Sequence, residues 1–540
     1  MLFVALIIWH RQLKEQLQHC HTLSKLNQES LSRIKRDFAA LTPCPPHVAD
    51  YFSLQDKDLN LYGPGSLGQL LFNLSTSLGD ARLAEWLSRG NPSPRLELHQ
   101  QAIQELAPQL DLRQRLYAYA RSPHHSGGHQ LHRFQSWAED TADNILIGPR
   151  AKSLGRLLTL LSLAGLALVI VRLSPAWILA LPVLLNLGFL GLHGRRFRQA
   201  FNNVDLQSGA LNCLSDIVEI IGEKEYQAQV LQQTRESLKR SPQRPGPALR
   251  RLAAIIHHSS LRFNAIPCIF LQSLLLWDFH VALKLQHWRK QHARHVALWL
   301  DAVACFEALS ALANLAHENP DWCFPERSNG PELHARQAVH PLLPAQRAVA
   351  NDIRLKPGQV TIITGSNMSG KTTYMRALGL NLKLAMAAGP VACAAMRLPP
   401  CELYTAISAN DSLSQGQSYF MNEVVQLKEV LAGVEQCRQQ PVYLLDELLK
   451  GTNERERNIA IIAVLKKLCA QQAMGMMTTH NIALATHPDL LPLCCSIYFE
   501  EDIDEQSPEK MRFSYRLKEG VSAQTNAIKL LRLLEIDINE

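Results

Sequence analysis

The stretch VTIITGSNMSGKTTYMRALGLNLKLAMAA, residues 360–388, decides the fold of the C-terminal part of the chain. Residues Val360–Thr364 are rich in β-branched side chains and run into a loop with a glycine at each end. An apolar-periodic helix follows and continues until Gly389-Pro390. Strand, glycine loop and helix in this order are the pattern of a P-loop, in which backbone N–H groups and the helix N-terminus face a phosphate chain. The stretch therefore predicts nucleotide binding.

The loop and the first helical turn supply the predicted nucleotide ligands. We expect Lys371 to reach the β- and γ-phosphates of ATP, and Thr372 to place its hydroxyl on Mg²⁺. A chance glycine-rich turn is the alternative, but the strand-to-helix context favours the P-loop. The expected nucleotide-binding residues are Gly365, Ser366, Asn367, Met368, Ser369, Gly370, Lys371, Thr372 and Thr373.

Two further patterns supply groups that ATP hydrolysis needs. The run PVYLLDE, 441–447, has a buried-strand pattern that ends in two acids. Asp446 is predicted to hold Mg²⁺, and Glu447 to orient or deprotonate water. Another strand-like run ends in TTH, and His480 is predicted to sense the γ-phosphate. A surface acidic pair and a purely structural histidine are the respective alternatives.

The run NDSLSQGQSYFMNE, 410–423, is a polar loop that enters a helix. A helix N-terminus with free hydroxyls suits a phosphate. Because the P-loop already holds its own phosphates, we expect this second anion-binding end to serve a nucleotide on another subunit. The pattern predicts ATP sandwiched in a dimer.

Composition sets broad limits on the rest of the chain. A length of 540 residues allows two to four domains. The formal charge of +7 permits contact with nucleic acid or anionic lipid but requires neither. The 12 cysteines form no CxxC pair and no regular spacing, which disfavours a zinc site or a disulfide framework and indicates a reducing compartment.

Two uncharged apolar runs, 157–171 and 176–192, follow each other with a short break at Arg172. Basic residues flank the pair on both outer sides, so the positive-inside tendency places both flanks in the cytoplasm. Each run is slightly short for a bilayer, but a tilted hairpin is admissible. We expect a transmembrane helical hairpin, with a hairpin buried in the protein as the alternative.

Two other apolar stretches are shorter. Met1–Trp9 is predicted to be a membrane-dipping anchor or the end of a spanning helix, with a helix start that packs on the protein as the alternative. The stretch 263–277 is too short and is followed by Asp278 and His280, so we interpret it as a helix buried in the core.

Four motifs together resemble the ATPase domain of the MutS-type mismatch-repair proteins, and their order and spacing agree with that family. They are GSNMSGKTTYMR at 365–376, DSLSQGQSYFMNEV at 411–424, DELLKGTN at 446–453 and TTHN at 478–481. The segment YRLKEGVS at 515–522 is similar to the closing strand and turn of the family. The resemblance is specific over about 339–536 and weaker upstream, at 59–87 and 301–316.

The resemblance implies an ABC-like fold, ATP with Mg²⁺ as cofactors, a homodimer and DNA as a ligand. Ser418 is similarly placed to the signature serine that acts on the partner's ATP, and His480 to the switch histidine. The chain departs from the family where an aromatic residue that stacks on adenine is usual, because it has Ala348 there. We also expect no mismatch-reading domain, no N-terminal Phe-x-Glu wedge and no C-terminal dimerising extension. The apolar hairpin is similar to the membrane-anchored branch of MutS-like ATPases.

The expected architecture is an α/β P-loop ATPase domain, ABC-like with a mixed sheet, that follows an all-α core and lever region interrupted by the transmembrane hairpin. The expected location is the cytoplasmic membrane of a bacterium, with the ATPase domain in the cytoplasm. The expected function is a membrane-anchored, DNA-binding ATPase, and an ATP-driven coupler that acts on a protein or lipid partner without DNA is the alternative. The expected domains are 1–41 (anchor and helix), 42–150 (first core part), 151–198 (hairpin), 199–338 (lever and second core part) and 339–540 (ATPase).

Overall fold

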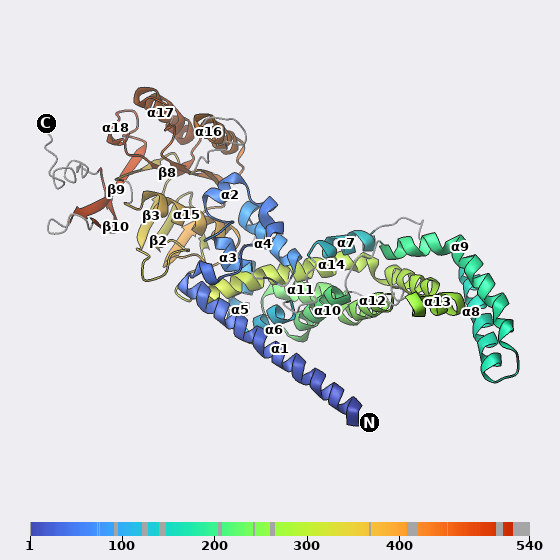
Figure 1. Ribbon diagram of the computed structural model, residues 1–540. Coiled ribbons are helices and arrows are strands. Elements are labelled where there is room, and N and C mark those ends of the chain that lie inside the picture. Colours follow the sequence, from blue (N-terminus) through green and yellow to red (C-terminus); the bar gives the residue numbers. More distant parts are fainter. Residues whose placement is uncertain are drawn as a thin grey trace, which may run out of the picture. The chain divides into compact units, whose positions relative to one another are not determined.

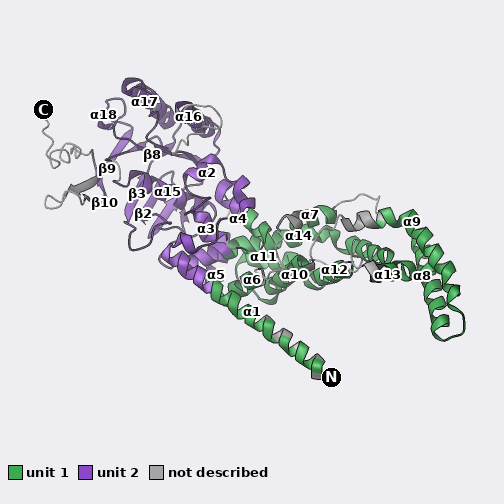
Figure 2. Ribbon diagram, viewed as in Figure 1, with its two compact units in different colours: residues 1–26, 74–82, 108–310 green, residues 27–73, 83–107, 311–540 purple. Residues whose placement is uncertain are grey.

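The computed structural model divides the chain into two compact units, which Figure 2 colours separately. Unit 1 comprises residues 1–26, 74–82 and 108–310, and unit 2 comprises 27–73, 83–107 and 311–540. Both units join segments that are distant in sequence, whereas the domains expected above are consecutive ranges, and those ranges stay a prediction. The structure describes residues 2–521 except 73, 75, 91–95, 121–127, 140–146, 203–207, 241–242, 260–264, 367–368, 408–418, 451 and 504–510.

A six-stranded sheet forms the centre of unit 2, in the order β10-β9-β4-β8-β7-β6 (Figure 1). All neighbouring strands are parallel except the pair β10 and β9, so the sheet is mixed, as expected. β4 lies between β9 and β8, and all five of its residues are buried. The strands are β4 (Val360–Thr364), β6 (Cys401–Ala406), β7 (Gln440–Asp446), β8 (Met474–Thr478), β9 (Cys494–Ile503) and β10 (Met511–Glu519).

Helices cover both faces of this sheet because alternate side chains of a buried strand point to opposite faces. On one face, α16 (Tyr419–Gln436) and α17 (Glu454–Ala470) pack on Tyr443 and Leu445 of β7 (Figure 1). On the other face, α15 (Lys371–Met386) lies against β7, where a Cβ on Gly379 would come within 3.1 Å of Leu444. The short helix α18 (Ile482–Ala485) follows β8. The strand and loop that carry the nucleotide motif are thus held between two layers.

A second sheet of four strands has the order β1-β5-β2-β3. Its strands are β1 (Glu326–Arg327), β2 (Leu333–Ala338), β3 (Asn351–Leu355) and β5 (Ala395–Leu398). The side chain of Asn351 bonds to closing strand β10, donating to the carbonyl of Tyr515 at 2.9 Å and accepting from the N–H of Leu517 at 2.9 Å. These two hydrogen bonds hold Tyr515 beside the N-terminal end of α15.

Two buried ion pairs join the helices of unit 2. Arg33 of α1 (Leu2–Lys35) donates from Nε to both carboxylate oxygens of Glu318 at 2.9 Å. Lys383 of α15 lies 2.6 Å from Asp56 of α2 (Leu54–Asp58) and donates to the carbonyl of Ser88 at 2.8 Å. The other helices of this unit are η1 (Phe38–Ala40), η2 (Pro46–Tyr51), α3 (Leu67–Leu71), α5 (Leu96–Leu106) and the end of α4 (Ser77–Arg89).

Unit 1 is helical in the part that the structure describes. Its core includes apolar residues of α10 and α12, such as Leu211, Ile217 and Leu252, which are fully buried. Trp137 of α7 stacks on Trp288 of α14 with ring centroids 5.9 Å apart. The helices are α6 (Leu110–Ala120), α7 (Gly128–Glu139), α8 (Pro149–Ile170), η4 (Ala176–Leu179), α9 (Ala180–Asn202), α10 (Ser208–Glu223), α11 (Gln229–Lys239), α12 (Pro245–Ser259), α13 (Ala265–Leu275) and most of α14 (Trp277–Glu318).

The two apolar runs form the helical hairpin α8 and α9, and its interior is polar. Asn186 of α9 is fully buried and donates from Nδ2 to Ser162 Oγ of α8 at 2.8 Å and to the carbonyl of Ser273 of α13 at 2.7 Å. Leucines lie on the outside of the hairpin, for example Leu160 and Leu184, which are 63% and 68% exposed. The hairpin is therefore not buried in the protein, so that alternative is wrong.

The stretch interpreted as a core helix becomes α13, and this expectation is wrong as well. α13 packs against α8 and α9 rather than in the core, and Ile269 and Phe270 are 67% and 63% exposed. The chain turns at Leu276, where φ is 49°, and α14 begins. In α1, Phe3 and Trp9 are exposed, so the expected alternative of a helix start packed on the protein does not hold for them.

Candidate active site

The loop between β4 and α15 has backbone geometry that requires glycine at both ends. Gly365 has φ 142° and Gly370 has φ 102°, conformations that side-chain-bearing residues rarely adopt. A Cβ on Gly365 would lie 2.9 Å from Ser369 Oγ, and one on Gly370 would lie 3.1 Å from the ring of Tyr515. The curled loop thus brings its backbone to the N-terminus of α15, where a phosphate is favoured.

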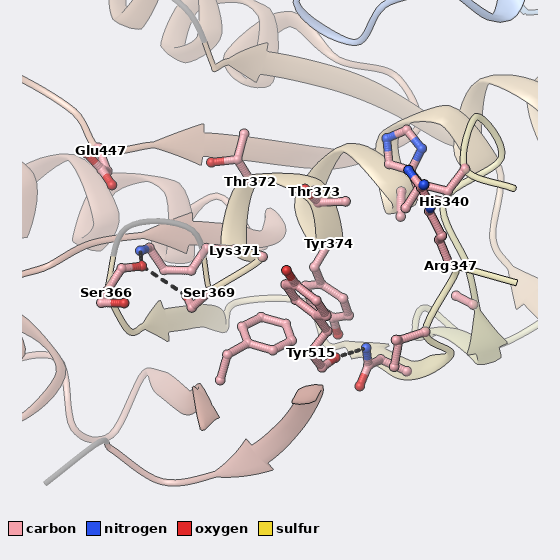
Figure 3. A pocket seen from close by; sticks show the side chains of 17 residues that line it. His340, Arg347, Ser366, Ser369, Lys371, Thr372, Thr373, Tyr374, Glu447 and Tyr515 are labelled. Carbon is pink, nitrogen blue, oxygen red and sulfur yellow. Dashed lines mark hydrogen bonds between the residues drawn. The ribbon is translucent and has the colours of Figure 1, made fainter. Parts of the chain in front are cut away.

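Lys371 lies over this loop. Its Nζ donates to the carbonyl oxygens of Gly365 at 2.8 Å and Ser366 at 2.6 Å, and the residue is almost entirely buried (Figure 3). Ser369 Oγ also donates to the carbonyl of Ser366, at 3.0 Å. A buried ammonium needs several oxygen acceptors. Phosphate oxygens can replace these carbonyls as hydrogen-bond acceptors with little movement of Nζ, because Nζ already lies beside the loop.

Asp446 connects the loop to two strands. It ends β7, and its Oδ2 accepts from Thr372 Oγ1 at 3.0 Å, while its Oδ1 accepts from Thr478 Oγ1 at the end of β8. The carboxyl ends of parallel strands meet at one edge of the sheet, which is why residues 74 apart in sequence touch here. A hydroxyl and a carboxylate oxygen at this spacing are the ligands that Mg²⁺ prefers.

Glu447 follows Asp446 with a left-handed φ of 45°, and its carboxylate lies beside His480 and Lys450. Oε1 lies 2.5 Å from His480 Nε2, and Oε2 lies 2.8 Å from Lys450 Nζ. These hydrogen bonds, that of His480 first, lower the pKa of Glu447 to about 2. The carboxylate is therefore ionised at neutral pH, as an acceptor of a proton from water must be.

Lys371, Thr372 and Glu447 line a cavity of about 650 Å³. In Figure 3, Glu447 and Ser366 lie at one end and His340 and Arg347 at the other. Burial, and then the charge of Arg376, lowers the pKa of His340 to about 4, so its imidazole is neutral at pH 7. Tyr515 lies between the two ends. A nucleotide would fill such a cavity, with its phosphates at the end near Ser366 and its base near Tyr515, His340 and Arg347.

Comparison with known proteins agrees with this geometry. The family model of MutS domain V matches residues 361–537. An endonuclease MutS2 from Enterococcus faecalis is 34% identical over 217 residues, which is 39% of this chain and 26% of that protein. The DNA mismatch repair protein MSH3 from Candida glabrata is 28% identical over 242 residues, 43% of this chain and 23% of that protein. Residues 361–537 thus match domain V of the MutS family.

The matched region is the ATPase domain of that family, and it supplies the phosphate-loop side of the cavity, whereas His340, Arg347 and Asn351 line the cavity from the segment before it. The chain spans about a quarter of the length of the two curated relatives. Its mixed α/β sheets and helical preceding part agree with the expected fold class. The resemblance on which the sequence analysis relied is thereby confirmed at the level of the family.

The structure brings most of the predicted site residues of this MutS-family domain together. The cavity is lined by Ser366, Ser369, Gly370, Lys371, Thr372, Thr373 and Glu447, while Asp446 and His480 contact Thr372 and Glu447. Asn367, Met368 and Ser418 lie outside the described residues. The roles assigned to all of these residues stay predictions.

Sequence reasoning gave no role to four residues that the structure places at the site. Lys450 and Thr478 lie within the quoted motifs, and their contacts to Glu447 and Asp446 arise from the turn after β7 and the end of β8. Arg347 and Tyr515 line the cavity from distant parts of the chain. Ala348, where the family has its aromatic residue, is not among the lining residues. No local sequence pattern predicts that Tyr515 lines the cavity, because its position depends on the hydrogen bonds between the side chain of Asn351 and β10.

Proposed function

We propose that this chain is a membrane-anchored MutS-like ATPase that binds ATP with Mg²⁺ and hydrolyses it. The observation that carries the proposal is the pairing of Thr372 with Asp446 at 3.0 Å beside the loop, with Glu447 lining the same cavity. Loop, metal ligands and ionised carboxylate are thus supplied within one site.

The residues fit both cofactors. The glycine loop leaves no room for a Cβ at Gly365, as a phosphate cradle requires, and Lys371 supplies a positive charge there. Thr372 and Asp446 would hold Mg²⁺, which neutralises phosphate charge when bound. Glu447 would orient water and take its proton, and His480, 2.5 Å away, would hold the carboxylate in place.

The dimer belongs to the proposal, and its support is the family resemblance. Ser418 would reach the ATP of a second copy, so that two ATP molecules lie between two ATPase domains. DNA is the proposed ligand on similar grounds, since one relative is named an endonuclease and another a DNA mismatch repair protein. Mismatch repair or recombination is the process in which we place it.

Membrane anchoring is supported by the distribution of polar and apolar residues in the hairpin. Within the part of the chain that the structure describes, three helices are long and apolar enough to cross a membrane, but one of them, α14, has 78% of its apolar window buried in protein. The other two, 149–170 and 176–195, have only 28% and 11% buried. Leucines face outward while Gly165, Ser162 and Asn186 face inward, the arrangement of helices that pack in lipid. We place the hairpin in a bacterial cytoplasmic membrane, with the ATPase domain in the cytoplasm.

The proposal is tested by ATP hydrolysis of the detergent-solubilised protein with and without homoduplex, mismatched and branched DNA. We expect hydrolysis that DNA stimulates, and stimulation that weakens as salt rises, because phosphate contacts release counterions. The Lys371→Ala variant is the control for hydrolysis by contaminants. Absence of hydrolysis above that control under all these conditions would contradict the ATPase assignment.

The exposed hairpin also favours a second function, an ATP-driven coupler at the membrane that acts on a protein or lipid partner without DNA. Its ATPase site is the same, so the two functions differ only in what stimulates turnover. Hydrolysis that no DNA alters at low or moderate salt would support the coupler over the DNA-binding ATPase.

A further inference from the structure

A second cavity, of about 1540 Å³, lies wholly within unit 1. Its walls come from the end of α7, the first turns of α8, from α12 and from the N-terminal half of α14. Trp137, Trp288 and Phe197 give it an aromatic side. No residue of the nucleotide site lines this cavity. Its ligand must therefore be argued from its own chemistry.

The cavity is strongly basic. α8 contributes Lys152 and Arg156, α12 contributes Arg251, and α14 contributes Lys284 and Lys290. Among the residues that the structure describes, Glu139 is the one acidic residue that lines it. Like charges gathered around one cavity repel each other, and an anion bound among them removes that cost. The cavity is thus suited to a negatively charged group such as a phosphate.

The helix α8 continues from this cavity into the outward-facing apolar surface of the hairpin. Lys152 and Arg156 lie in its first two turns, and the exposed Leu157 and Leu160 come directly after them. At 1.5 Å of rise per residue, Leu160 is about 6 Å further along the helix than Arg156. A ligand bound to the basic residues therefore has an exposed apolar surface within reach. Such a ligand is charged at one end and apolar at the other.

We propose that this cavity binds the phosphate headgroup of an anionic membrane lipid, whose acyl chains lie along the exposed leucines of α8. The proposal rests on the membrane hairpin proposed above, since it places Lys152 and Arg156 at the level of the headgroups. Nucleic acid would match the basic residues but has no acyl chains to cover Leu157 and Leu160.

The test measures lipid preference of the full-length protein in a neutral detergent. Phosphatidylglycerol and phosphatidylcholine are added in equal amounts, and the lipids retained are counted by native mass spectrometry. We expect the wild-type protein to retain phosphatidylglycerol in clear excess. The triple variant Lys152→Gln, Arg156→Gln, Arg251→Gln should lose that preference by about tenfold or more, since each basic residue near a surface contributes appreciably to anionic-lipid attraction.

A matched variant removes the same charge elsewhere in unit 1. Lys25, Lys239 and Arg240 are exposed and do not line the cavity, so changing all three to Gln should leave the preference unchanged. Loss of preference in this variant to the same extent would show that net charge, rather than the cavity, selects the lipid, and would overturn the proposal.

Flotation with vesicles of phosphatidylcholine alone separates this proposal from the hairpin on which it rests. Protein that does not float contradicts both. Protein that floats but retains the two lipids equally in detergent overturns the lipid site alone. Glycerol 3-phosphate that displaces phosphatidylglycerol at equal concentration would assign the cavity to a soluble phosphate. A triple variant that loses DNA retention but keeps its lipid preference would assign it to nucleic acid. Either result overturns the proposal.

Discussion

Glu447 is the residue on which the proposed chemistry depends most. Its backbone has a positive φ, which costs a non-glycine residue of the order of 1–3 kcal/mol and is concentrated at functional sites. The N–H of Glu447 donates to the carbonyl of Thr478 and to its hydroxyl, each at 3.2 Å, and these bonds hold the strained turn. The strain positions the carboxylate beside His480 and at the edge of the nucleotide cavity.

Changing Glu447 to Gln should keep ATP binding and abolish most hydrolysis. The amide is the same size but cannot accept a proton from water, and general bases contribute about 10²–10⁴-fold to rates. ATP would then accumulate in a closed dimer, which size-exclusion chromatography with ATP would detect. Lys371→Ala should instead abolish nucleotide binding. Ordinary turnover in both variants would contradict the assigned site.

Changing Lys450 to Met should alter the pH dependence of hydrolysis. Hydrogen bonds from His480 and Lys450 lower the pKa of Glu447 from 4.5 to about 2, so loss of Lys450 raises that pKa part of the way back. The base is lost as pH falls through its pKa, and the acidic limb of the kcat profile should therefore move to higher pH. The matched control is Lys466→Met, which breaks an exposed pair with Asp489. An acidic limb shared by both variants and the wild type would count against this role of Lys450.

At the scale of elements, α15 carries the site at one end and a buried ion pair near the other. Lys383 and Asp56 have side chains only 8% and 2% exposed, and Ser88 Oγ also donates to Asp56 at 2.8 Å. The nucleotide helix is thereby fixed to α2 and to the end of α4. If α15 moves when a phosphate binds, α2 and the end of α4 must move with it, because all three helices share this buried contact.

Changing Lys383 to Ala should destabilise unit 2 by about 3–5 kcal/mol, because Asp56 would be left as a buried charge without its partner. The double variant Lys383→Met, Asp56→Asn removes both charges and should recover much of the loss. The midpoint of urea unfolding measures each effect. Lys467→Ala breaks an exposed pair with Glu435 and should cost less than about 1 kcal/mol. Equal losses of unfolding free energy in Lys383→Ala and Lys467→Ala would show that the buried ion pair stabilises unit 2 no more than the exposed pair does.

At the scale of the whole molecule, the two units are interleaved along the chain. Helices α1, α4 and α14 each have residues in both units. The nucleotide cavity is in unit 2, and the hairpin and the basic cavity are in unit 1. Three continuous helices therefore connect the part proposed to hydrolyse ATP with the part proposed to meet the membrane.

Deleting residues 157–192 should release the protein from membranes. Without the two apolar helices the exposed leucines of the hairpin disappear, and these leucines form the apolar surface that is proposed to lie in lipid. Fractionation after carbonate washing measures the effect. ATP binding by the deleted protein serves as the control for folding, since the nucleotide cavity lies in the other unit. A deleted protein that stays with the membranes would overturn the proposed topology.

Local sequence patterns are sufficient to predict the parts of the site that follow one another along the chain. The order of strand, glycine loop and helix at Val360–Met386 and the acids that end β7 are local patterns, because glycine conformation and strand burial are set by neighbouring residues. The apolar hairpin with its basic flanks is also evident from composition alone. The family resemblance rested on these same local motifs.

The contacts between groups that are distant in sequence follow from how the elements pack. Tyr515 reaches Gly370 because Asn351 bonds to β10, and Lys450 and His480 converge on Glu447 because a strained turn directs them there. The stretch 263–277 was misassigned to the core, because apolar composition alone cannot tell burial in protein from packing beside an exposed hairpin. The basic cavity was invisible as well, since its charges come from separate helices whose packing no local pattern specifies.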